Sequence, residues 1–180
     1  TQQVSSAASD VYKRQKWNPA VKKETDRKQL INAINNNIID VIATDHAPHT
    51  SDEKNNSYFN APSGGPLVQH ALLALLELEK NKEMELKQIV KKTSHDVADC
   101  FKIRDRGYLR PGYFADLVLI NKQKDFLVNK ENILYKCEWS PFEGVKFSSS
   151  VDSTFINGNR VFHNGNFNEK QNGRRLTFNR

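Results

Sequence analysis

The chain has 180 residues, and its 27 Lys and Arg against 21 Asp and Glu give a formal net charge of +6. This length is enough for one domain, or for one domain and part of another. A membrane-spanning helix needs about 20 consecutive apolar residues. The densest apolar stretch, residues 67–78, is shorter and is interrupted by Gln69, His70 and Glu77. We therefore expect no association with a membrane.

The basic residues are scattered and have acidic neighbours, as in Lys22-Lys23-Glu24 and Arg104-Asp105-Arg106. Only Arg174, Arg175 and Arg180 near the C-terminus lack such neighbours. A nucleic-acid-binding surface would be denser in basic residues and interleaved with aromatic ones. The charge therefore indicates a solvated surface, and we expect no nucleic-acid partner.

The N-terminus and the cysteines bear on where the protein resides. Residues 1–15 lack the apolar core of a cleavable signal peptide. They are polar and aperiodic and resemble translated non-genomic sequence, so we interpret them as a non-native or disordered tail. Cys100 and Cys137 are too few for a disulfide scaffold or a Cys-based zinc site. We predict a reduced, cytoplasmic setting, with both cysteines as buried free thiols.

The first globular elements predict an α/β fold. A helix is predicted over residues 26–36, with Thr25 as its N-cap and an apolar stripe at helical spacing. Residues 38–44 are β-branched and apolar on both faces, which is typical of a strand buried in a parallel sheet. A helix followed directly by such a strand indicates α/β architecture.

Three further helices are predicted after a polar loop. The longest covers residues 67–80, and two shorter ones cover about 85–92 and 95–101. Thr93 and Asp96 have the spacing of a capping box between the shorter helices. The core-facing stripe of the long helix is predicted to be Val68, Ala71, Leu72, Leu75, Leu76 and Leu78.

Beyond residue 102 the apolar pattern changes to the two-residue period of strands. Residues 115–120 predict a strand, and residues 153–163 predict a hairpin that turns at Asn157-Gly158. Asn164-Gly165 predicts another turn. The chain therefore divides near residue 105 into an α/β part and a β-rich part.

Asp45 is the strongest candidate for a functional residue. It follows the predicted strand directly, and His46 and His49 lie on the same turn. Ligands of parallel α/β folds bind at the carboxyl ends of the strands, where a carboxylate can bind a metal or move a proton. An Asp that caps the turn beside two solvated histidines is the structural alternative. One Asp and two His are not a complete site.

The other polar motifs are less specific. The Ser63-Gly64-Gly65 turn could present backbone N–H groups to an anion, or could be an ordinary junction between loop and helix. The sequence contains neither a phosphate-binding P-loop nor a GxSxG motif. Three more histidines fit structural or surface roles better than ligand roles: His70, His95 and His163.

Residues 39–49, IDVIATDHAPH, resemble the strand-eight motif of dihydroorotases in the cyclic amidohydrolase group of the amidohydrolase superfamily. The resemblance covers roughly residues 16–180. It extends through six more segments: 18–20, 61–72, 92–95, 107–119, 132–137 and 139–144.

This resemblance implies a fold and a reaction. Residues 16–105 would form the C-terminal portion of a metal-dependent TIM (β/α)8 amidohydrolase barrel, and residues 106–180 a small β-sandwich subdomain. Dihydroorotases reversibly cyclise N-carbamoyl-L-aspartate to (S)-dihydroorotate and water in pyrimidine biosynthesis. Family members hold one or two zinc ions, which lower the pKa of bound water.

The same resemblance implies the roles of the site residues. Asp45 matches an aspartate that ligates the metal and shuttles a proton during catalysis. His49 matches a histidine that binds the carboxylate of the substrate. Pro62, Ser63 and Gly64 match a loop that contacts the substrate, largely through its backbone.

The length departs from the family pattern. A TIM barrel takes about 250 residues, and a catalytic zinc site normally has three protein ligands, of which only Asp45 is found here. The chain therefore resembles the C-terminal third of a dihydroorotase, and we expect it to be inactive and free of catalytic zinc alone. Alternatives are an allantoinase or dihydropyrimidinase, or a non-catalytic partner of aspartate transcarbamoylase. The sequence leaves open whether the protein assembles into a homo-oligomer.

Overall fold

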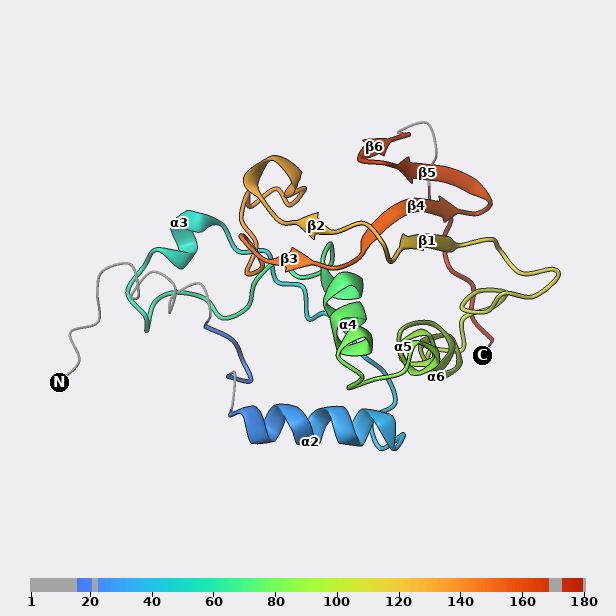
Figure 1. The fold of residues 1–180 in the computed structure, drawn as a ribbon, viewed down its shortest axis with the longest axis horizontal. Helices are drawn as coiled ribbons and strands as arrows, with labels where there is room; N and C mark the ends of the chain where they lie inside the picture. The colour runs from blue at the N-terminus through green and yellow to red at the C-terminus, as the bar shows by residue number, and fades with distance from the viewer. Residues whose placement is uncertain (1–15, 21–22, 169–172, 180) are drawn as a thin grey trace. The chain divides into compact units, whose positions relative to one another are not determined.

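The computed structural model of the protein describes residues 16–20, 23–168 and 173–179 (Figure 1). The interpretation of residues 1–15 as a tail lies outside this range. The described chain forms two compact units. The first comprises residues 16–20, 23–27, 44–72 and 127–146, and the second comprises residues 28–43, 73–126, 147–168 and 173–179.

The first helix, α2, spans Glu24–Asn35, close to its predicted bounds. Its cap differs from the prediction, because Thr25 lies inside the helix. The carbonyl of Lys23 accepts hydrogen bonds from the N–H groups of Asp26 (3.0 Å) and Arg27 (3.2 Å). The Asp26 carboxylate in turn accepts a bond of 3.0 Å from the Lys23 N–H. A first-turn carboxylate therefore caps this helix, as the helix dipole favours.

Residues 38–44 do not form the predicted strand. The side chain of Ile38 is 74% exposed, and the Ile42 N–H donates to the carbonyl of Lys92 (3.0 Å) without a regular ladder. A buried parallel strand needs hydrogen-bonding neighbours along its length. An apolar pattern predicts which faces avoid water, but it does not supply those neighbours.

Helix α4 spans Ala71–Lys80 and begins later than predicted, although the Ala71 N–H already bonds to the carbonyl of Leu67 (3.1 Å). Leu73 and Leu76 are its buried residues, whereas Val68, predicted to lie in the core, is 58% exposed. The stripe was therefore only partly predicted, because the segment before Ala71 forms turns rather than regular helix.

Three short helical segments follow without a break: α5 (Leu86–Val90), a π-helical turn (Lys91–His95) and α6 (Asp96–Cys100). The predicted capping box is wrong. Thr93 Oγ1 donates to the carbonyl of Ile89 (2.8 Å), and the Asp96 carboxylate binds the ammonium groups of Lys91 (2.6 Å) and Lys92 (2.8 Å). These ion pairs occupy the carboxylate that a capping box would require.

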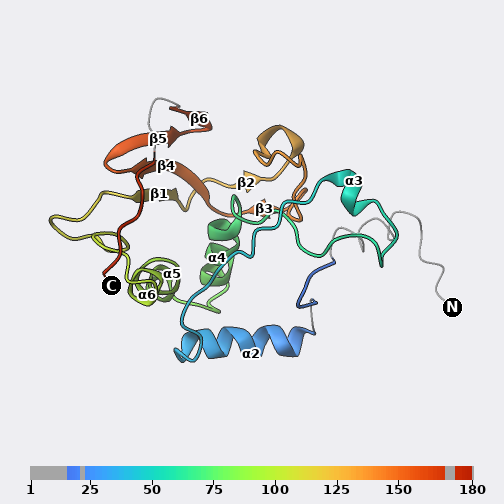
Figure 2. The same cartoon turned by 180° about the vertical axis from the view of Figure 1, so that it is seen from behind.

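The strands of the β-rich part are β1 (Leu117–Asn121), β2 (Phe126–Leu127), β3 (Lys146–Phe147), β4 (Ser150–Ile156), β5 (Asn159–His163) and β6 (Asn166–Phe167). Four of them form an antiparallel sheet in the order β1-β4-β5-β6 (Figures 1 and 2). The hairpin of β4 and β5 turns at Asn157 (φ 52°) and Gly158 (φ 82°), as predicted. A further two-stranded sheet pairs β2 with β3.

Within the described residues, no helix combines the length and the apolar character that a membrane span requires. The two cysteines are free thiols. Cys137 is buried as predicted, whereas Cys100 is exposed at the end of α6, which corrects the prediction for that residue.

Candidate active site

All the predicted site residues lie in the first compact unit, on two segments that the structure brings together. Asp45 has a left-handed backbone (φ 47°), which is uncommon outside glycine, and its side chain is exposed. Immediately after it, His46 forms a parallel β-bridge with Gly65, and the Ala47 N–H donates to the Gly65 carbonyl (3.1 Å). The bridge places the Asp45 turn beside the loop that contains Ser63 and Gly64.

His46 has a structural role. Its Nδ1 accepts hydrogen bonds from the backbone N–H groups of Leu67 (3.0 Å) and Val68 (3.4 Å). Its ring also lies 5.4 Å, centroid to centroid, from that of Tyr135. Because Nδ1 is an acceptor, the proton of the neutral ring is assigned to Nε2. His46 therefore joins its turn to the residues that precede α4.

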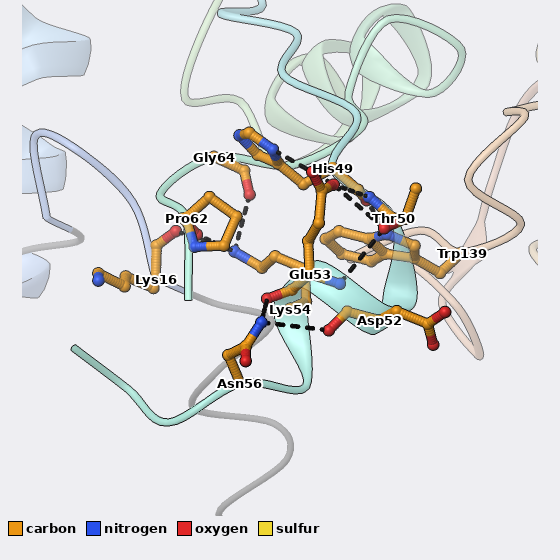
Figure 3. Close-up of polar contacts among 10 residues, drawn as sticks. All are labelled: Lys16, His49, Thr50, Asp52, Glu53, Lys54, Asn56, Pro62, Gly64 and Trp139. Carbon is orange, nitrogen blue, oxygen red and sulfur yellow. Dashed lines mark hydrogen bonds and ion pairs between the residues drawn. The ribbon is translucent and has the colours of Figure 1, made fainter. Parts of the chain in front are cut away.

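His49 is half-buried and is held from two sides (Figure 3). Its carbonyl oxygen accepts a hydrogen bond of 2.8 Å from the indole N–H of Trp139, a residue that is 2% exposed. Its Nδ1 lies 3.7 Å from a carboxylate oxygen of Glu53. The backbone is thereby fixed, and the imidazole faces a negative charge.

A short helix, α3 (Ser51–Lys54), follows His49 directly. Thr50 caps it in a capping box with Glu53, whose N–H donates to Thr50 Oγ1 (3.3 Å) and whose carboxylate accepts from the Thr50 N–H (2.7 Å). The bonds from the backbone and side chain of Thr50 hold the pKa of the Glu53 carboxyl below its usual value. The spacing of Thr50 and Glu53 could have predicted this helix from the sequence.

Two lysines bind backbone carbonyls of the loop over residues 58–64. The ammonium of Lys54, at the end of α3, binds the carbonyls of Pro62 (2.9 Å) and Gly64 (2.9 Å) (Figure 3). The ammonium of Lys16 binds the carbonyls of Ala61 (2.6 Å), Tyr58 (2.8 Å) and Phe59 (3.3 Å). The predicted substrate loop is therefore ordered by charge-assisted hydrogen bonds to its own backbone.

Gly64 and Gly65 lie so close to neighbouring side chains that neither position has room for a Cβ atom. Gly64 has φ of 103°, and a Cβ atom there would lie 2.7 Å from Cβ of Ala47. A Cβ atom on Gly65 would lie 2.8 Å from the ring of Trp139 and 2.9 Å from that of Trp17. The absence of side chains thus lets the loop pack directly against the Asp45–His49 turn and the two indoles.

Residues 132–142 form hydrogen bonds to the segment that follows the loop, at Gln69 and His70. Tyr135 Oη accepts from the Gln69 N–H (2.8 Å), and the Gln69 side chain donates to the Asn132 carbonyl (2.7 Å). His70 is fully buried, with Nδ1 3.1 Å from Ser140 Oγ. Burial lowers the pKa of His70 to about 4, so its ring is neutral at pH 7. The structural role predicted for His70 is consistent with these contacts.

Residues 11–161 match the sequence model of the amidohydrolase family, which covers more than half of the chain. The chain belongs to the amidohydrolase family. Similar curated proteins include the dihydroorotase of Clostridium acetobutylicum, 36% identical over 82% of this chain, and that of Clostridioides difficile, 32% identical over 82%. The chain spans about a third (35%) of the length of these relatives.

Solved amidohydrolase structures share the fold of the chain. A D-hydantoinase superposes with a TM-score of 0.80 at 20% identity, covering 86% of this chain and 35% of the other. The L-hydantoinase of Arthrobacter aurescens superposes with a TM-score of 0.78 at 23% identity, covering 89% and 37%. The mixed α/β fold class is therefore that of the amidohydrolases.

The amidohydrolase family implies a metal, and the residues described here do not complete a site for one. Across residues 16–20, 23–168 and 173–179, no group of three or more His, Cys, Asp and Glu side chains could hold a metal ion. Of the residues on the turn, His46 already uses Nδ1 for backbone N–H groups, and only Asp45 presents an exposed carboxylate. Asp45 could supply one ligand of the three that a catalytic zinc site normally has.

Two residues of this site were not singled out as candidates from the sequence. Lys54 gives no local signal of burial, because a lysine in a polar loop is normally solvated. Trp139 lies in a segment that resembles dihydroorotases, but its hydrogen bond to His49 spans 90 positions. Long-range partners of this kind are not encoded in spacing.

Proposed function

We propose that these residues belong to a dihydroorotase, which reversibly cyclises N-carbamoyl-L-aspartate to (S)-dihydroorotate and water. The observation that carries the proposal is the similarity to curated dihydroorotases, at 32–36% identity over about four fifths of the chain. Because the chain spans about a third of these relatives, the proposal concerns the complete protein. Its further metal ligands would lie outside these 180 residues.

Asp45 is proposed to act at the reacting amide, as a metal ligand and as the group that carries the proton. In the hydrolytic direction, the ring C–N bond breaks and the leaving nitrogen must gain a proton, which a protonated carboxyl can donate. In ring closure the carboxylate takes that proton back, and one water is released. The exposed side chain and left-handed backbone of Asp45 support this role.

His49 and the loop at Pro62, Ser63 and Gly64 are proposed to bind the substrate. Both substrates carry a carboxylate, for which an imidazole and backbone N–H groups are suitable donors. The fixed His49 carbonyl and the ordered loop carbonyls support this assignment, because a preorganised site loses less entropy on binding.

The complete protein is proposed to hold one or two zinc ions and to act in pyrimidine biosynthesis in the cytoplasm. Residues 16–105 are proposed to complete a (β/α)8 barrel, and residues 106–180 to form a small β-sandwich subdomain. The amidohydrolase fold shared with the hydantoinases supports the barrel. The antiparallel sheet of β1, β4, β5 and β6 supports the β subdomain.

The activity is tested by assaying the complete protein on dihydroorotate, hydantoin, dihydrouracil and allantoin. A dihydroorotase hydrolyses dihydroorotate with the highest kcat/KM and closes N-carbamoyl-L-aspartate in the reverse direction. Preference for hydantoin or dihydrouracil would instead establish a dihydropyrimidinase, the alternative supported by the similarity to hydantoinase structures.

A non-catalytic partner of aspartate transcarbamoylase is the second alternative. Asp45 and His49 are both present, which favours a catalytic protein over a decayed one. Co-purification with aspartate transcarbamoylase, without turnover of any of the four substrates, would decide for the partner role.

A further inference from the structure

Lys54 is an unusual residue to find within this unit. Its side chain is 0% exposed. Its ammonium lies 2.9 Å from the Pro62 carbonyl, 2.9 Å from the Gly64 carbonyl and 3.4 Å from that of Lys16. It also lies 6.0 Å from the centroid of the Trp139 ring. The ammonium is therefore surrounded by backbone dipoles and an aromatic ring.

Within the described residues, Lys54 forms no ion pair with a carboxylate. Burial of a charged lysine without such a partner is costly. Desolvation, followed by the nearby charge of Lys16, lowers the pKa of the Lys54 ammonium. An apolar side chain of the same length would avoid this cost, so a lysine at this position points to a role that needs its charge or its three donors.

The role of Lys54 is indicated by the geometry of the peptide between Pro62 and Ser63. In a planar trans peptide the C=O group and the following N–H group point in opposite directions. Because the Pro62 carbonyl faces Lys54, the N–H of Ser63 is directed away from the ammonium. No residue in the described part of the chain accepts a hydrogen bond from this N–H.

The lysine also connects the two halves of the site. Lys54 ends the helix that begins next to His49, and its ammonium holds the loop on either side of Ser63 (Figure 3). Together with the bond from the Ala47 N–H to the Gly65 carbonyl, Lys54 therefore helps to set the spacing between the imidazole of His49 and the N–H of Ser63.

We propose that Lys54 is a positioning residue that orients the Ser63 N–H, together with His49, to bind the carboxylate of the substrate. This inference rests on the proposed dihydroorotase function, because that function supplies the anionic substrate. Lys54 itself does not touch the substrate; it acts through the peptide between Pro62 and Ser63.

The test compares Lys54→Met with the native sequence in the complete, metal-loaded protein. Methionine keeps the length of the side chain and removes the charge and the donors. We expect KM for dihydroorotate to rise about tenfold or more, with a much smaller change in kcat, because the orientation of the binding loop is lost. We also expect faster amide hydrogen exchange at Gly64, whose N–H donates to the Lys16 carbonyl (2.8 Å) in the loop that Lys54 holds. Lys136→Met, at an exposed lysine of the same unit, is the matched control and leaves both unchanged.

A pH profile separates positioning from simple stabilisation. The KM of the native enzyme should rise at alkaline pH as the Lys54 ammonium loses its proton, and this rise should be absent in Lys54→Met. An active variant with native KM and native exchange at Gly64 would overturn the inference. Inactivity of the native protein on dihydroorotate would overturn the proposed function instead. In that event, unchanged exchange at Gly64 in Lys54→Met would also overturn the role of Lys54 in the loop.

Discussion

The indole N–H of Trp139 donates a hydrogen bond of 2.8 Å to the carbonyl oxygen of His49, across 90 positions of the chain. The bond fixes the backbone of a residue proposed to bind substrate. Because Trp139 is 2% exposed, neither partner can readily exchange this bond for one to water. The C-terminal segment therefore takes part in building the candidate site.

Replacing Trp139 by Phe should destabilise the protein. The substitution removes the donor to the His49 carbonyl, and a buried acceptor without a partner costs about 1–3 kcal/mol. Loss of ring volume adds to this cost. Urea denaturation of the complete protein measures the change.

Trp17→Phe is the control for Trp139→Phe. The Trp17 ring also lies beside Gly65, but its indole N–H has no acceptor among the described residues. Equal losses of stability in the two variants would show that the bond to His49 contributes nothing beyond packing.

Gly65→Ala should be destabilising despite the small size of the change. The new Cβ would approach the rings of Trp139 and Trp17 to 2.8 Å and 2.9 Å, so at least one indole must move. Overpacking of this kind costs about 1–3 kcal/mol. Thermal unfolding measures it, and Gly173→Ala, where a Cβ atom meets nothing within 4 Å, should be neutral. A neutral Gly65→Ala would mean that the indoles are not tightly packed there.

His70 should make stability depend on pH in the acid range. Burial lowers its pKa from 6.5 to about 4, so as pH falls below about 6.5 the unfolded chain binds a proton that the folded chain does not. Stability is therefore full above pH 6.5 and is lost progressively towards pH 4, by up to about 3 kcal/mol. Urea denaturation at several pH values should reveal this slope.

His70→Gln separates this effect from that of other groups. The variant should lose the part of the slope that lies between the two pKa values, while His163→Gln, at a more exposed histidine, should retain it. A His70→Gln variant with the native slope would assign the pH dependence elsewhere.

Asp45→Asn should abolish most of the proposed activity without unfolding the protein. The amide cannot donate and accept the proton as the carboxyl does, and loss of a general acid–base group costs about 10²–10⁴-fold in rate. Steady-state kinetics on dihydroorotate measure the loss. Asp52→Asn, at an exposed acid on α3, should retain native kcat. Native kcat in Asp45→Asn would remove Asp45 from the mechanism.

Local patterns predicted the elements whose stability is local. The Asn157-Gly158 hairpin was correct because both residues adopt the positive φ that this turn requires. The predicted bounds of helix α2 were close to the observed ones because its apolar spacing and first-turn acids lie within one segment. The strand predicted over residues 38–44 was wrong because a strand depends on hydrogen-bonding partners that no pattern within the segment can reveal.

For the candidate site, too, local features were predicted from the sequence and long-range contacts were not. The position directly after an apolar segment pointed to Asp45, whereas the resemblance to dihydroorotases pointed to His49 and to the loop at residues 62–64. Spacing alone did not distinguish His46 from His49, and the bonds of His46 to Leu67 and Val68 show its structural role. The contribution of Lys54 became visible only with its three carbonyl partners.

The enclosure of Lys54 also has a consequence for surface chemistry. Amine-reactive reagents need a deprotonated amine that they can reach, and this one is 0% exposed. Exposed lysines such as Lys136 and Lys80 should acquire label within minutes, while Lys54 should do so only when the loop at Pro62 and Gly64 opens. The rate at which Lys54 is labelled, measured by mass spectrometry, therefore reports how often the candidate site opens in the native sequence, without any substitution.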